Sequence, residues 1–211
     1  LNKVQETHAD EIVSFKNGYF ITQPATYVAR RKGVQKKLNK LNEFLYRSGK
    51  QDADNKVADW FHTVGKGVCF VEPSDDAEAP FRAYAIDPRS AFVVYSLKAG
   101  NKPVMGVNFV TRDGVAMFDV FTEQMVYHLK GTYTGKLMTT EKNHNFLVTA
   151  TEVVSSEPNV LGRIPIIEYR YNSINMGAFE ACIPLLDEIN NIVSNACDGV
   201  EQFIQSLAVA V

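Results

Sequence analysis

The chain of 211 residues lacks most of the features that would assign it to a class directly. No apolar run reaches the ~18 residues of a membrane-spanning helix, and no signal-peptide pattern opens the sequence. The three cysteines, Cys69, Cys182 and Cys197, have no CxxC spacing and lie in apolar patterns, which favours reduced core thiols in a cytoplasmic setting. A formal net charge of −2 gives no global indication of nucleic-acid or membrane binding.

Motifs of common catalytic and nucleotide-binding sites are missing as well. There is no GxSxG, GxGxxG or HExxH sequence, and the four histidines are scattered along the chain. Residues 131–137 look like a phosphate loop, but the glycines are one residue too close and the segment falls between two predicted strands. Cys69 and His62 lie on different predicted elements without a thiol-protease signature. The sequence therefore predicts no catalytic residue, no metal or cofactor site and no enzyme activity.

Lysine and arginine are absent from residues 176–211, a segment that carries five acidic residues. The same segment holds the longest helical pattern, because its apolar residues recur at offsets of three, four and seven. The pattern predicts a helix from about Ala178 to Leu207, with Pro184 either delaying its start or kinking it. A helix that gripped phosphates would carry basic side chains, so this one is expected to repel them.

The apolar stripe of this helix is longer than a small domain can cover. Its first part, to about Val193, is expected to pack on the sheet of the domain through Ile183, Leu186 and Ile189. Beyond Ala196 the helix is expected to project, with its apolar positions available to a second helix or a neighbouring subunit. The candidates for this packing are Ile192, Ala196, Val200, Phe203 and Leu207.

Basic residues gather near the start of another predicted helix, residues 34–47. This basic cluster consists of Arg30, Arg31, Lys32, Lys36, Lys37 and Lys40. Cations at a helix N-terminus oppose the macrodipole, so helix formation does not explain them. A solvated face is the leading interpretation, and contact with an acidic neighbour or with nucleic acid are the alternatives.

The remaining elements are helical at first and then mostly strands. Helices are expected over residues 3–16 and 34–47. A third helix is expected to be capped by Asp52 and to end at Gly65. Residues 18–24 are expected to be extended. The strands expected are 67–71, 81–86, 91–97, 105–111, 115–121, 124–130, 137–140, 146–154 and 164–169, and those of the middle form an antiparallel meander. This order predicts an α+β fold with N-terminal helices, a central antiparallel β meander and a long C-terminal helix. It divides the chain into a domain of residues 1–175 and a helix of residues 176–211.

Five short motifs follow one another along the chain. They are Gly18-Tyr19 with Pro24; Gly65-Lys66-Gly67 before a strand; Asp87-Pro88-Arg89; Ile164 to Ile167 followed by Gly177, Phe179 and Glu180; and Leu186, Asp187, Asn190, Ser194, Glu201 and Phe203 along the long helix. In this order they resemble the portal proteins of tailed bacteriophages, in the branch with long non-contractile tails.

The resemblance implies a ring homo-oligomer, usually of twelve subunits, at one vertex of the capsid in the virion, assembled in the host cytoplasm. Double-stranded DNA would pass through the ring without sequence recognition during packaging and ejection. The partners would be capsid, packaging-motor and head–tail adaptor proteins, with ATP hydrolysis left to the motor and no membrane involved. Residues 1–175 would be the wing and the long helix the first stem helix, with Asp198 and Glu201 on the channel side.

A portal continues through a clip, a second stem helix, a tunnel loop and a crown. The chain starts without Met and stops inside an apolar run, so we expect it to be a part of a longer protein. Three other classes stay open: a DNA-binding module that uses the basic cluster, a capsid-associated scaffold or adaptor, and an enzyme without a recognised motif.

Overall fold

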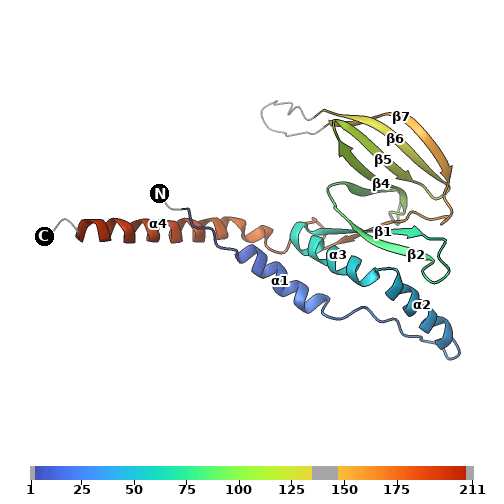
Figure 1. The fold of residues 1–211 in the computed structure, drawn as a ribbon, viewed down its shortest axis with the longest axis horizontal. Helices are drawn as coiled ribbons and strands as arrows, with labels where there is room; N and C mark the ends of the chain where they lie inside the picture. The colour runs from blue at the N-terminus through green and yellow to red at the C-terminus, as the bar shows by residue number, and fades with distance from the viewer. Residues whose placement is uncertain (1–2, 135–146, 208–211) are drawn as a thin grey trace.

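The computed structural model describes residues 3–134 and 147–207 and confirms the predicted α+β fold. A layer of helices lies under a small sheet, a larger sheet lies above it, and one long helix extends away from these layers (Figure 1). The predicted strand at 137–140 and the start of the one after it lie outside the described residues.

The helices and strands follow one another in the predicted order. The helices are α1 (His8–Phe20), α2 (Gln35–Arg47), α3 (Lys50–Val64), the short 3₁₀ helix η1 (Glu180–Cys182) and α4 (Ile183–Leu207). The strands are β1 (Lys66–Pro73), β2 (Phe81–Ile86), β3 (Ala91–Tyr95), β4 (Pro103–Arg112), β5 (Val115–Phe121), β6 (Met125–Thr134), β7 (Leu147–Pro158) and β8 (Ile166–Arg170).

The strands form two antiparallel sheets instead of one continuous arrangement. The small sheet has the order β2-β1-β8, and the larger one is the meander β3-β4-β5-β6-β7. The predicted meander therefore covers only the larger sheet. β8 pairs antiparallel with β1 across a long stretch of sequence, and its Ile166 is buried.

The small sheet separates two hydrophobic cores. Cys69 on β1 packs with Ala53 and Val57 of α3, whereas its neighbour Val68 packs with Ile166 and with residues of β3. This alternation follows from the two-residue period of a strand. The apolar run of β1 is thus buried on both faces, between α3 and the larger sheet.

One turn and one close approach between the sheets depend on glycine. In the β4–β5 hairpin Arg112 pairs with Val115, and the two loop residues, Asp113 and Gly114, have φ of 52° and 78°. A two-residue turn of this kind needs positive φ at both positions. The turn confirms that the predicted strands 105–111 and 115–121 are antiparallel neighbours in the meander. On β4, a Cβ at Gly106 would lie 2.7 Å from Ile164 Cγ2, so glycine lets the two sheets approach there.

Three predicted helix boundaries are wrong. α1 begins at His8 and not at residue 3, and it continues past residue 16 to Phe20, whose ring stacks on Phe61 of α3 with centroids 5.6 Å apart. This packing supports the last turn of the helix, and residues 18–20 are not extended. Asp52 does not cap α3; it lies inside the first turn, where it pairs with Lys56.

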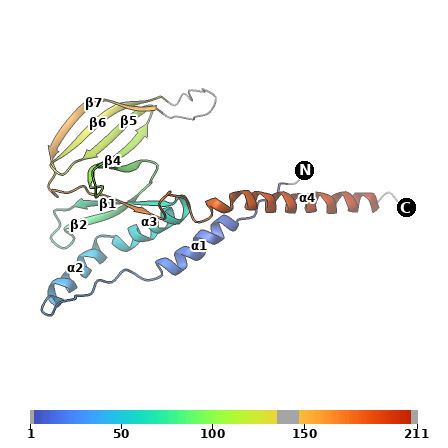
Figure 2. The same ribbon diagram turned by 180° about the vertical axis from the view of Figure 1, so that it is seen from behind.

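α4 begins later than its apolar pattern suggests. η1 occupies residues 180–182, and the helix starts at Ile183, which leaves Pro184 in the first turn. Proline is tolerated there because its missing N–H would have no helical partner. Of the two predicted effects of Pro184, a delayed start is the one observed. With 25 residues α4 is about 37 Å long, and Figures 1 and 2 show it extending away from both sheets.

Candidate functional site

Backbone segments at the base of α4 lie against the C-terminal end of α3. The Ala178 N–H donates to the carbonyl oxygen of His62 at 2.7 Å, and the Tyr171 N–H donates to that of Gly65 at 2.9 Å. A Cβ at Gly177 would overlap the carbonyl oxygen of Thr63. Only glycine permits this approach, so α4 is anchored directly to α3.

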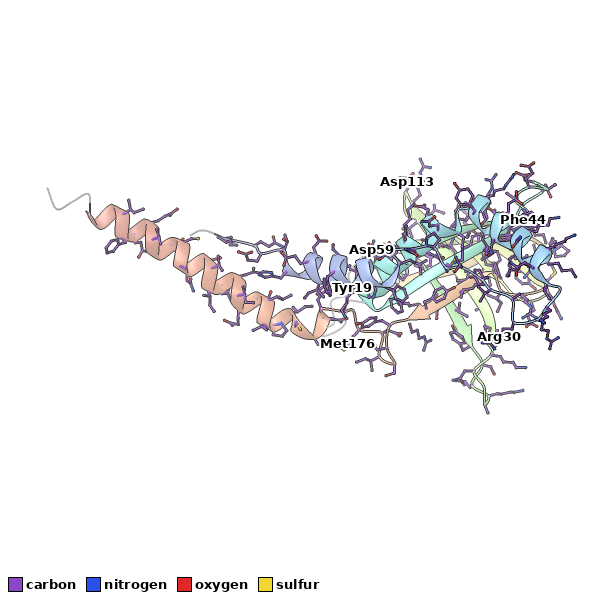
Figure 3. The ribbon with its side chains drawn as sticks, turned by 90° about the horizontal axis from the view of Figure 1, so that it is seen from below. Tyr19, Arg30, Phe44, Asp59, Asp113 and Met176 are labelled. Carbon is purple, nitrogen blue, oxygen red and sulfur yellow. The ribbon has the colours of Figure 1, made fainter. Side chains whose placement is uncertain are left out.

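Two polar side chains shape the turn that leads into α4. Asn172 Oδ1 accepts hydrogen bonds from the N–H groups of Ile174 and Met176 at 3.1 and 2.9 Å. Glu180 Oε2 accepts from the Gly177 N–H at 2.8 Å. Figure 3 labels Met176 where α4 leaves the body of the molecule. Because these bonds satisfy the backbone of the turn, they fix the direction in which α4 departs.

The first residues of the chain form a second support for α4. In this N-terminal strap, residues 3–7, the Val4 N–H donates to Ser194 Oγ at 3.0 Å and the Glu6 N–H donates to Asn190 Oδ1 at 2.9 Å. Asn190 and Ser194 are four residues apart and so lie on one side of the helix. The sequence alone hardly predicts this contact, because its only sign is the helical spacing of the uncharged polar residues Asn190 and Ser194.

The expected packing of α4 on a sheet is wrong. Ile183 and Leu185 at its start are exposed, and both views of the ribbon show the helix pointing away from the sheets (Figures 1 and 2). The anchored turn sets this direction. Leu186, Ile189 and Val193 are only half-buried.

The predicted packing candidates lie on an exposed side of α4. Ile192, Val200 and Phe203 are 64%, 59% and 66% exposed, and Ala196 is exposed too. The exposure of Val200 and Phe203 confirms that α4 projects beyond Ala196. Leu207 is the last residue of α4, and its side chain lies outside the described part of the structure.

The acidic candidates lie away from this stripe. By helical spacing Asp198 and Glu201 continue the row of Asn190 and Ser194, on the opposite side of α4 from Val200 and its apolar neighbours. Asp198 is half-buried and Glu201 is exposed. α4 therefore has an apolar side and an acidic side, and the strap contacts the polar one.

A buried carboxylate joins the two sheets. The side chain of Glu168 on β8 is 2% exposed and forms a 2.6 Å ion pair with Lys66 Nζ. It accepts hydrogen bonds from the Val93 N–H of β3 at 2.8 Å and from the Tyr95 hydroxyl at 3.2 Å. Burial and the adjacent Glu168 raise the pKa of Tyr95. The network satisfies an edge amide of β3 and fixes how the sheets meet.

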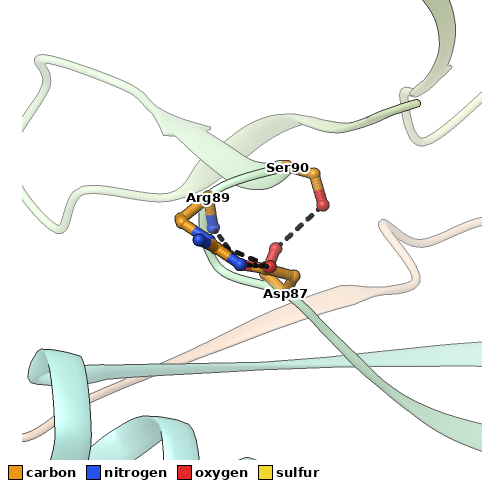
Figure 4. A network of polar contacts seen from close by, with 3 residues as sticks. All are labelled: Asp87, Arg89 and Ser90. Atoms are coloured by element: carbon orange, nitrogen blue, oxygen red, sulfur yellow. Dashed lines mark hydrogen bonds and ion pairs between the residues drawn. The ribbon is translucent and has the colours of Figure 1, made fainter. Parts of the chain in front are cut away.

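A second connection between the sheets is the turn from β2 to β3. It contains Asp87-Pro88-Arg89, one of the five motifs that resemble portal proteins. Asp87 accepts two hydrogen bonds from Arg89 Nε and one from Arg89 Nη2, and the Ser90 hydroxyl donates to the Asp87 carbonyl at 3.0 Å (Figure 4). The bonds from Arg89 lower the pKa of the Asp87 carboxyl. Arg89 also lies over the ring of Trp60, 5.6 Å from its centroid, which ties the turn to α3.

The two thiol-protease candidates are both buried in structural positions. His62 Nδ1 lies 2.6 Å from Asn17 Oδ1 of α1, among the rings of Phe20, Phe61 and Tyr171. Burial, and then the charge of Lys16, lower the pKa of His62. Cys69 is in the core under α3, where burial raises the pKa of its thiol and opposes the reactive thiolate.

The basic cluster lies where the chain turns into α2, at the end of the molecule away from α4 (Figures 1 and 3, with Arg30 labelled). All six of its residues are exposed. Within residues 3–134 and 147–207, no group of three or more His, Cys, Asp or Glu could hold a metal ion, and no helix is long and apolar enough to cross a bilayer.

A family model described as "Phage portal protein, SPP1 Gp6-like" matches residues 1–211, the whole chain. The chain belongs to this phage portal protein family. No individual curated protein matches it. Portal proteins of this family are structural and not enzymatic, and membership implies ring assembly at the capsid vertex of the virion. The match favours the portal interpretation over the DNA-binding module, the adaptor and the enzyme.

Proposed function

We propose that residues 1–175 form the wing of a portal subunit and that residues 176–211 form the stem helix that joins subunits into a ring. The exposed apolar stripe of α4 carries this proposal. An apolar side this long on a projecting helix marks an interaction surface. Ile192, Ala196, Val200, Phe203 and Leu207 would pack against a second stem helix or the neighbouring subunit.

The polar side of α4 would face the channel of the ring, with Asp198 and Glu201 toward passing DNA. Acidic side chains repel phosphates, and a segment without Lys or Arg would let the duplex slide without being gripped. The ring would contain twelve subunits and assemble in the host cytoplasm. It would contact capsid, packaging-motor and head–tail adaptor proteins, and the subunit itself would hydrolyse no ATP.

The test measures the mass in solution of the protein that carries these residues, as wild type and as the Phe203→Asp variant. The mass tells whether the subunits form a ring. The wild type is expected to form a ring, and the variant to remain monomeric because a charge enters the apolar contact. The matched control is Gln202→Asp, since Gln202 is also exposed and its helical position points away from the stripe.

The stability of the single subunit provides the second measurement. Both variants are expected to change its free energy of unfolding by less than about 1 kcal/mol, because Gln202 and Phe203 are both exposed. Rings of Phe203→Asp with wild-type mass would contradict the proposal. So would a ring lost equally in Gln202→Asp, because the apolar stripe would then have no special role.

A further inference from the structure

We propose that the basic cluster is a second DNA-binding surface, which holds the phosphate backbone of a duplex against the outside of the wing without reading its sequence. The proposal goes beyond the channel role of the ring and does not depend on it. It requires only that Arg30, Arg31, Lys32, Lys36, Lys37 and Lys40 be accessible together, which they are.

The first argument is that nothing described in the chain neutralises these charges. No acidic residue occurs in residues 12–42. None of the six cations forms an ion pair with an acidic side chain that the structure describes, whereas Arg47 at the other end of α2 pairs with both Glu43 and Glu78. The charges are concentrated at the end of the molecule farthest from α4 (Figure 1).

The second argument comes from the helix that the cluster precedes. The first turn of α2 contains no acidic residue, and its N-cap Val34 makes no side-chain hydrogen bond. Lys36 and Lys37 therefore add positive charge where the helix dipole is already positive, which disfavours the helix. A phosphate bound at this end would reverse the effect, because helix N-termini favour anions. Without a ligand the cluster destabilises the start of α2, whereas with a polyanion bound it would no longer do so.

The third argument favours DNA over an acidic protein surface. Duplex DNA carries one charge about every 1.7 Å along its axis, so an exposed group of cations can contact several phosphates whatever the base sequence. Arginine also binds a phosphate through two parallel hydrogen bonds. α4, which carries acidic and no basic residues, lies at the opposite end of the molecule. The two ends would thus treat DNA in opposite ways: α4 repels the duplex and the basic cluster attracts it.

The experiment measures the affinity of the 211-residue chain for a labelled random-sequence duplex by fluorescence anisotropy at 50 and 200 mM salt. Contact with three to four phosphates predicts an affinity that falls roughly 40- to 150-fold over this range. Replacement of Arg30, Arg31, Lys36 and Lys37 by Glu is expected to lower the affinity at 50 mM salt on the order of 100-fold.

The matched control replaces Lys98, Lys102, Arg112 and Arg163 by Glu, four exposed residues outside the cluster, and gives the same net charge. It is expected to weaken binding less than about fivefold, through the long-range field alone. Both variants should unfold at the wild-type denaturant midpoint, because the replaced side chains are exposed.

A cluster variant that binds DNA like the wild type would overturn the proposal, as would a control variant that loses as much affinity. Loss of self-assembly with DNA binding retained would also overturn it, and would assign the cluster to an acidic surface of a neighbouring subunit. Ring mass is measured separately on the same variants. If the protein that carries these residues forms no ring but the 211-residue chain still binds DNA through the cluster, the proposed portal assembly is refuted and this inference is supported.

Discussion

Glu168 shows how one residue can determine the arrangement of two sheets. Its carboxylate is enclosed between β8 and β3 and is compensated by Lys66, Tyr95 and the Val93 amide. The sequence places Glu168 in an apolar strand but cannot show that the acid turns inward. Its partners lie more than 70 residues away, and no local pattern links them.

Substitution of this carboxylate tests its role in stability. Glu168→Gln removes the charge and leaves Lys66 without its buried partner, which is expected to lower the free energy of unfolding by about 3 kcal/mol. Urea denaturation of the chain measures this loss. Glu123→Gln, at an exposed acid in a turn, is expected to change it by less than about 1 kcal/mol. Equal effects of the two substitutions would show that the network does not stabilise the fold.

At the scale of elements, local signals were predicted well and distant contacts were not. The β4–β5 hairpin follows from Asp113-Gly114, and α2 from its apolar spacing, because both depend on neighbours in sequence. The split into two sheets, the end of α1 at Phe20 and the support of α4 depend on tertiary contacts. The exposed stripe of α4 was predictable because a helix this long exceeds the surface available to cover it.

Two glycines near and within α4 make a matched pair for testing the junction. Gly177→Ala would place a Cβ against the Thr63 carbonyl, so the base of α4 must shift, with an expected loss of about 1–3 kcal/mol. Gly199→Ala meets nothing within 4 Å and lies inside the helix, so it is expected to stabilise α4 by about 0.5–1 kcal/mol. Thermal unfolding of the two variants measures their stabilities relative to the wild type. Opposite signs support a close-packed junction, and a neutral Gly177→Ala would contradict it.

At the scale of the whole molecule, α4 is held at two places. The junction fixes its base, and the N-terminal strap holds its middle through Asn190 and Ser194. The strap continues into α1, which packs on α3. A helix that extends away from the two sheets is thereby connected to them both through the junction and through the strap. Two connections define its direction better than the junction alone.

Removal of the strap contacts should loosen the direction of α4. In the double variant Asn190→Ala, Ser194→Ala, the distance distribution between spin labels at Gln202 and Lys98 is expected to broaden, because only the junction then restrains the helix. The labels require Cys182 and Cys197 to be replaced by Ser, because Cys182 is exposed and Cys197 is half-buried, and only Cys69 is the core thiol that the sequence predicted for all three. Electron paramagnetic resonance measures the distribution.

The control for this variant is Asn191→Ala, Asn195→Ala, which changes two exposed asparagines at the same spacing on another side of α4. Its distance distribution is expected to match the wild type. Equal broadening in both double variants would show that helix composition, and not the strap, controls the direction of α4.

The separation of charge along the molecule has a consequence for any closed assembly. A basic cluster at one end and an acidic, lysine-free helix at the other separate charge along each subunit and contribute to an electric dipole moment. In a cyclic ring the components perpendicular to the symmetry axis cancel, whereas the components along it add with every subunit. A ring of these subunits would therefore be electrically polar along its axis, and a polyanion approaching from solution would meet its two faces with different probability.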